Sequence, residues 1–218
     1  MKSIESLENY MKVNLPNLTI SMPLFYNSEI GIRFEIGDSN IDYFEEKTKY
    51  MNGVYMKSIV LFEEVFNPNT DIYIVVNASR WIDDEIDENK EKEKLHKYIK
   101  NKELYNTIEG IKLSYIYKDN DDEDESITFR YCLDCKLKDI KYRELLKSIG
   151  NQDMGIKPSF YDEVYFINKN ENIIYHLYDD RGLDIVSSKA ASIKHIYDKY
   201  NKWILDYDRK RINKTFLK

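Results

Sequence analysis

The 218-residue sequence contains only two cysteines, four prolines and seven glycines. Two cysteines are too few for a disulfide scaffold or a four-ligand zinc site. The scarcity of glycine and proline predicts a chain rich in helices and strands with short connections. The sequence also lacks a run of about 18 apolar residues, which excludes a membrane-spanning helix. Its first ten residues contain acids and Asn where a signal peptide has an apolar centre, so we expect a cytoplasmic protein.

The net charge is −6, from 33 Lys and Arg against 39 Asp and Glu. This balance disfavours a generally basic nucleic-acid binder but not a local basic patch. Because 42% of the residues are hydrophobic and 14% are aromatic, we expect a folded protein despite the high charge. At roughly 150 residues per domain the length fits a single domain, with the charged region 105–125 as a candidate sub-boundary.

Apolar residues at helical spacing predict helices over residues 3–14, 43–66, 83–104, 139–149 and 188–216, the last with a bend near Asp206. Alternating patterns and short apolar runs predict strands over residues 29–36, 72–76, 111–117, 127–137, 163–168, 172–178 and 183–187. The run 72–76 is apolar throughout and should be a central strand buried on both faces. This order predicts an α+β fold, a single domain with a mixed, mainly antiparallel sheet of about six to seven strands and helices packed on it.

The sequence lacks the phosphate loop, the dinucleotide-binding glycine pattern, HExxH and GxSxG. Cys132 and Cys135 have the spacing of a redox motif, but in a strand two residues three apart point to opposite faces. We therefore expect the two thiols to pack separately and to stay reduced and inert. No cofactor, no metal site and no catalytic residue is predicted.

The densest negative charge lies in the predicted hairpin loop 119–125, whose six carboxylates are candidate partner-binding residues: Asp119, Asp121, Asp122, Glu123, Asp124 and Glu125. The loop lacks the central glycine and the closing Glu of an EF-hand calcium site. A solvated loop accounts for this charge. The alternative is an electrostatic contact with a basic partner, for which this loop is the first candidate.

Two polar loops supply further candidates. His176 lies beside the turn that contains Asp179, Asp180 and Arg181, and together these side chains could grip a ligand or partner. The structural alternative is a tight turn in which Asp accepts backbone hydrogen bonds, Arg181 pairs locally and Gly182 adopts positive φ.

The second loop follows a predicted helix and begins with Asn151, Gln152 and Asp153. These side chains either satisfy the helix end or form one edge of a cleft shared with the 179–182 turn. The other two histidines, His96 and His195, lie among charges on predicted helices and should be surface residues.

Five segments of the chain combine unusual residues and follow one another in a fixed order: 24–27 (LFYN), 31–35 (GIRFE), 151–155 (NQDMG), 178–182 (YDDRG) and 201–205 (NKWIL). Through them the chain resembles the bacterial proteins of domain of unknown function family 3885, over nearly its whole length. The resemblance implies one domain and supplies no activity. Small acidic α+β proteins of this type are also similar, as a class, to immunity proteins of bacterial toxin systems.

The sequence favours a non-enzymatic protein-binding module, an immunity, antitoxin-type or phage-conflict protein that neutralises a partner. Negative charge supports this function because many toxins that act on nucleic acids are basic, and opposite charges accelerate association. The alternatives are a small metal-dependent hydrolase or nuclease that uses carboxylates with His176, and a small-ligand sensor. The expected partner is a protein, such as a basic toxin or enzyme, rather than a membrane or a nucleic acid.

Overall fold

One antiparallel sheet runs through the molecule. The computed structural model describes residues 3–81, 83, 86–114, 116 and 126–217. Within them, seven strands follow the order β1-β7-β6-β5-β2-β4-β3, and each pair of neighbours is antiparallel. The strands are β1 (Gly31–Glu35), β2 (Asp71–Trp81), β3 (Glu109–Ser114), β4 (Ser126–Lys136), β5 (Glu163–Asn168), β6 (Ile173–Leu177) and β7 (Gly182–Ser187).

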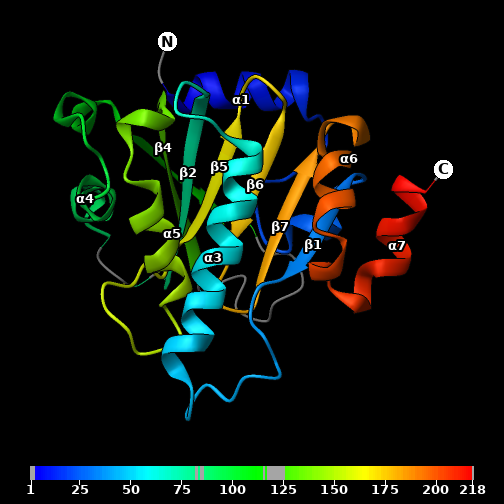
Figure 1. Ribbon diagram of the computed structural model, residues 1–218. Coiled ribbons are helices and arrows are strands. Elements are labelled where there is room, and N and C mark those ends of the chain that lie inside the picture. The colour runs from blue at the N-terminus through cyan, green and yellow to red at the C-terminus, as the bar shows by residue number, and fades with distance from the viewer. Residues whose placement is uncertain (1–2, 82, 84–85, 115, 117–125, 218) are drawn as a thin grey trace.

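Helices cover both faces of this sheet (Figure 1). The helices α3 (Lys47–Val65), α5 (Tyr142–Gly150) and α6 (Ala190–Lys199) pack on one face, and α1 (Ser3–Asn14) packs on the other. We call these the α3 face and the α1 face. The short helix α2 (Leu24–Asn27) and the last helix α7 (Asp206–Phe216) lie beside β1, and α4 (Glu88–His96) lies near β2. This arrangement confirms the predicted single α+β domain.

Side-chain alternation along the strands divides the core into two clusters. In β2, Ile72, Ile74 and Val76 point to the α3 face, whereas Tyr73 and Val75 point to the α1 face. All five are buried, which confirms the predicted central strand. No helix in the described part of the chain is long and apolar enough to cross a membrane.

The two cysteines lie on opposite faces of β4, as predicted. Cys132 packs in the α1-face cluster and Cys135 in the α3-face cluster, and both are free and buried. Burial raises the pKa of both thiols, which favours the neutral thiol over the thiolate. Their chemical inertness stays a prediction.

The predicted final helix 188–216 is divided into α6, a 3-10 helix over Asn201–Trp203, and α7. Two further helices are shorter than their sequence patterns indicate. The helix predicted from residue 43 begins at Lys47, because Asp42 accepts the backbone N–H groups of Phe44 and Glu45 and holds a turn there. The helix predicted over 83–104 spans only Glu88–His96. After it, Ile99 forms a bridge with Ile140 and leaves the helical path. The described part of region 105–125 includes β3, which pairs with β4 in the common sheet.

Replacing Val75 by Asp should prevent folding. Val75 is fully buried in the centre of β2, between Cys132 of β4 and Tyr165 of β5. An unpaired buried carboxylate costs several kcal/mol, a large part of the stability of a domain. Ser79→Asp is the matched control, since Ser79 lies on the same strand and face but is exposed. Circular dichroism and thermal unfolding check this, and a cooperatively folding Val75→Asp protein would refute the assignment.

Candidate functional site

Three neighbouring strands place charged and polar side chains in one row on the α1 face. Arg33 of β1 pairs in register with Asp184 of β7, which pairs in turn with His176 of β6. Asp184 and His176 are fully buried. A buried charge is tolerated only with close partners, so the contacts of Asp184 decide how this part of the sheet is held together.

Asp184 accepts its three shortest hydrogen bonds from donors on two segments. Its Oδ1 lies 2.8 Å from Nε of Arg33, and its Oδ2 lies 3.1 Å from Nη2 of the same guanidinium. The backbone N–H of Phe25 also donates to Oδ2, at 2.9 Å. This fork geometry binds α2 and β1 to β7.

The network continues from Arg33 into α7. Nη1 of Arg33 lies 3.7 Å from Oδ2 of Asp208, and the hydroxyl of Tyr26 donates to Oδ1 of Asp208 at 2.8 Å. The guanidinium carbon of Arg33 also lies over the rings of Tyr26 and Phe25, at 4.7 and 5.3 Å. Burial alone would lower the pKa of Arg33, but the bonds to Asp184 outweigh it and raise the pKa.

His176 belongs to the interior rather than to the neighbouring turn. Its Nδ1 lies 2.9 Å from the carbonyl oxygen of Val164, and its ring stacks on Tyr165 with centroids 4.1 Å apart. Burial lowers the pKa of His176, so its neutral form is native. Within the described residues no hydrogen bond or ion pair joins it to the 179–182 turn, and the predicted patch of His176 with that turn is not formed.

The other two histidines differ in exposure. His195 is exposed, as predicted, but His96 is half-buried and its ring stacks on Tyr105 at 4.1 Å. The prediction of a surface position for His96 is therefore wrong, because η1 (Lys102–Thr107) folds its tyrosine over the imidazole.

The 151–155 loop and the 179–182 turn meet in space. Arg181 lies 3.5 Å from a carboxylate oxygen of Asp153, and the side-chain amide of Gln152 donates to the carbonyl oxygen of Tyr178. The segment 38–46 contacts the first of these loops, since the hydroxyl of Tyr43 donates to the carbonyl oxygen of Met154 at 2.6 Å. We call the surface formed by residues 38–46, 151–155 and 179–182 the acidic edge.

Within this edge the buried acids hold the turn together. Asp179 accepts hydrogen bonds from the backbone N–H groups of Arg181 and Gly182, and it pairs with the Arg181 guanidinium. These are the contacts expected for the structural alternative, a tight turn. Asp180 accepts the hydroxyl of Tyr50 at 2.6 Å, and burial raises the pKa of Asp180.

The predicted positive φ of Gly182 is wrong, since Gly155 is the glycine with positive φ in the described chain. Gly182 begins β7 in extended backbone, and its small size is needed for another reason. An added Cβ would lie 2.5 Å from the ring of Tyr178.

Asn151 has a structural role in the same edge. It is buried, accepts the hydroxyl of Tyr55 in α3 and donates to the carbonyl oxygen of Pro158 at 2.8 Å. The side chains left for a partner are therefore those of Asp153 and Arg181, which are both exposed. Carboxylate oxygens of Asp153, Asp179 and Asp180 lie within 4.8 Å of one another, a spacing compatible with a cation, but Arg181 already pairs with two of these acids.

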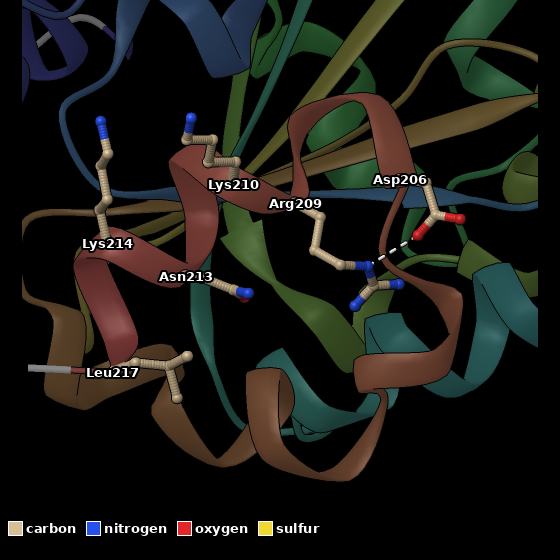
Figure 2. Close-up of a pocket in the computed structure, with 6 residues that line it drawn as sticks. All are labelled: Asp206, Arg209, Lys210, Asn213, Lys214 and Leu217. Atoms are coloured by element: carbon tan, nitrogen blue, oxygen red, sulfur yellow. Dashed lines mark hydrogen bonds and ion pairs between the residues drawn. The ribbon is translucent and has the colours of Figure 1, made fainter.

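An open hollow of about 630 Å³ lies along α7 and shares no residue with the acidic edge. Figure 2 shows the side chains that line it: Asp206, Arg209, Lys210, Asn213, Lys214 and Leu217. The sequence patterns gave no indication of this surface. The six candidate carboxylates of loop 119–125 lie outside the described residues.

The comparisons with known proteins agree with the resemblance carried by the five segments. A family model described as a domain of unknown function, DUF3885, matches residues 7–208. The chain belongs to this family. It is 30% identical to the uncharacterized protein YnaE of Bacillus subtilis (strain 168), over 93% of this chain and 98% of that protein. No solved structure matches.

In this member of DUF3885, three of the five segments converge on the buried network. Phe25 and Tyr26 come from the first segment, Arg33 from the second, and Tyr178 from the fourth donates to Asp184 at 3.5 Å. The third segment meets the fourth at the acidic edge. Four of the five segments that distinguish the sequence therefore lie in connected parts of the molecule.

The buried His176 predicts a loss of stability in mild acid. Because its native pKa lies below the ordinary 6.5, the unfolded chain binds the proton first as pH falls. The free energy of unfolding should therefore decrease from about pH 6.5 down to the native pKa. Urea unfolding of wild type and His176→Gln across this range measures it. An equally steep decrease in both proteins would contradict the assignment.

Proposed function

We propose that this DUF3885 protein is a non-enzymatic protein-binding module of the immunity or antitoxin type, which neutralises a basic partner. The acidic edge is the part of the described surface where the partner docks. The loop 119–125 adds to the attraction through its six carboxylates.

The exposure of Phe44 is the observation that carries this proposal. Phe44 is 92% exposed, although an aromatic ring gains free energy from burial. Its backbone N–H donates to Asp42 at 2.8 Å, and its ring lies edge-on to Tyr43, with centroids 5.5 Å apart. Exposed aromatic side chains of this kind are enriched in protein interfaces relative to the rest of the surface.

The charges around Phe44 indicate the sign of the charge that its partner should carry. The acidic edge contains seven carboxylates and one cation, Arg181. Asp42, Glu45, Glu46 and Asp153 are exposed. Of the two lysines that adjoin the edge, Lys49 pairs with Glu46 at 2.8 Å, and Lys47 donates to the carbonyl oxygen of Met154 at 3.5 Å. Acids around an aromatic anchor favour a basic surface and accelerate its approach.

The same geometry supports binding better than hydrolysis. His176, the base in the hydrolase alternative, is fully buried behind Tyr165. Asp179 is committed to the turn and to Arg181, and Asp180 to Tyr50. A general base needs hydrogen-bond reach to substrate, which none of these groups offers in this arrangement.

Neutralising the exposed acids should slow association with the partner. The variant combines Asp42→Asn, Glu45→Gln and Asp153→Asn, and a second variant replaces Asp121, Asp122, Asp124 and Glu125 by Asn or Gln. Association of the partner captured from the native host should fall by about tenfold or more at low salt, with a smaller deficit at high salt. Phe44→Ala should mainly accelerate dissociation, with little dependence on salt.

The control variant removes the same number of negative charges as the edge variant, but from a surface away from the acidic edge. Glu88→Gln, Glu93→Gln and Glu103→Gln remove three exposed acids on α4 and η1. If association slows equally in this control variant, net charge rather than the position of the acids accounts for the effect. A partner whose association is indifferent to the edge variant, the loop variant and ionic strength would rule out the electrostatic interface.

A further inference from the structure

The last helix differs in charge from the rest of the chain. Four cations and two carboxylates lie in α7, in a protein of net charge −6. Both carboxylates have partners: Asp206 pairs with Arg209 at 2.7 Å, and Asp208 is held by Tyr26 and Arg33. The remaining cations, Lys210, Arg211 and Lys214, are exposed.

These three cations share one face of the helix with an aromatic ring. At 100° per residue, Tyr207, Lys210, Arg211 and Lys214 fall within about 100° of arc. Tyr207 is 85% exposed, while the opposite side of α7 buries Asp208, Ile212 and Phe216 in the protein. We call the face of these four residues the cationic face.

The cations of this face are available and one is already positioned. In the part of the chain that the structure describes, neither Lys210 nor Lys214 has a hydrogen-bond or ion-pair partner. Figure 2 shows the two ammonium groups extending from α7 in the same direction, one turn apart. Arg211 donates to the carbonyl oxygen of Ser28 at 2.9 Å and lies over the ring of Phe25.

A hollow borders the cationic face and adds neutral donors. Asn213 lines the hollow, and its Oδ1 accepts the hydroxyl of Tyr197, which leaves the amide N–H groups for a ligand. Lys210 and Lys214 line the same hollow of about 630 Å³. Along the helix axis they lie about 6 Å apart, roughly the spacing of successive phosphates in an extended single strand.

We propose that the cationic face of α7 binds single-stranded nucleic acid, with its three cations on phosphates and Tyr207 stacked on a base. Proteins that bind single strands combine cations that follow the backbone with exposed aromatic rings for the bases. An acidic peptide would use the cations but not the ring. A membrane surface would require a broad apolar face, and residues 206–217 expose only Tyr207 and Leu217 as large apolar side chains.

Salt dependence of binding gives a quantitative test. Fluorescence anisotropy of a labelled oligothymidylate with the full chain should give a slope of log K against log salt of about −2, since each phosphate contact on a single strand contributes about −0.7. The double variant Lys210→Ala/Lys214→Ala should reduce the slope to about −0.7 and weaken binding at least about fivefold at low salt. Tyr207→Ala should weaken binding with the slope unchanged.

Lys102→Ala/Lys138→Ala is the matched control, because both lysines are exposed and lie beside β3 and β4 rather than α7. It should bind as wild type does. Absence of binding at low salt, or binding that the α7 variants leave unchanged, would overturn the proposal. Polyglutamate or anionic vesicles that bind as tightly as the oligonucleotide, with the same response to Tyr207→Ala, would also overturn it.

Discussion

Asp184 is a fully buried carboxylate, and the arrangement at the β1 side of the sheet depends on its partners. The side chains of Arg33 and Asp184 are 14% and 1% exposed, so water contributes little to the solvation of either charge. The guanidinium and the backbone N–H of Phe25 replace that water. Loss of one partner would leave an unpaired charge inside the protein, which is far more destabilising than loss of a surface ion pair.

The same network links the two surfaces to which we assign partners. β7 begins at the turn of the acidic edge, and Asp184 lies two residues into that strand. Arg33 then connects Asp184 to Asp208 in α7, whose opposite side is the cationic face. A chain of buried charges therefore orients an acidic surface and a basic helix on one scaffold.

The sequence predicted the strands well because alternation is a local property. Each of the seven predicted strands is present, and the buried central strand extends to Trp81. Helix ends were less predictable, since a single side chain such as that of Asp42 can replace a helical turn with another one. The four-residue helix α2 was missed, because so short a segment has no periodicity.

The candidate site was predictable only in part. The contact between the 151–155 loop and the 179–182 turn was one of two alternatives, and the sequence could not decide between them. Arg33 occupies the polar side of an alternating strand, a pattern that normally indicates solvent, and its partner lies 151 residues away. Two charges of the region 83–104 are also paired inside the fold, since Glu91 and Lys94 form a closed set of ion pairs with Arg80 and Asp162. Such pairs depend on strand register, which composition does not encode.

A double-mutant cycle between Arg33 and Asp184 tests the central claim most directly. Urea unfolding of Arg33→Met, of Asp184→Asn and of the double variant gives the coupling free energy. We expect each single variant to lose about 3–5 kcal/mol and the coupling to be about 2 kcal/mol or more, whereas the exposed pair Lys194 and Asp198 should couple by under about 0.5 kcal/mol. Strictly additive losses at Arg33 and Asp184 would contradict the account.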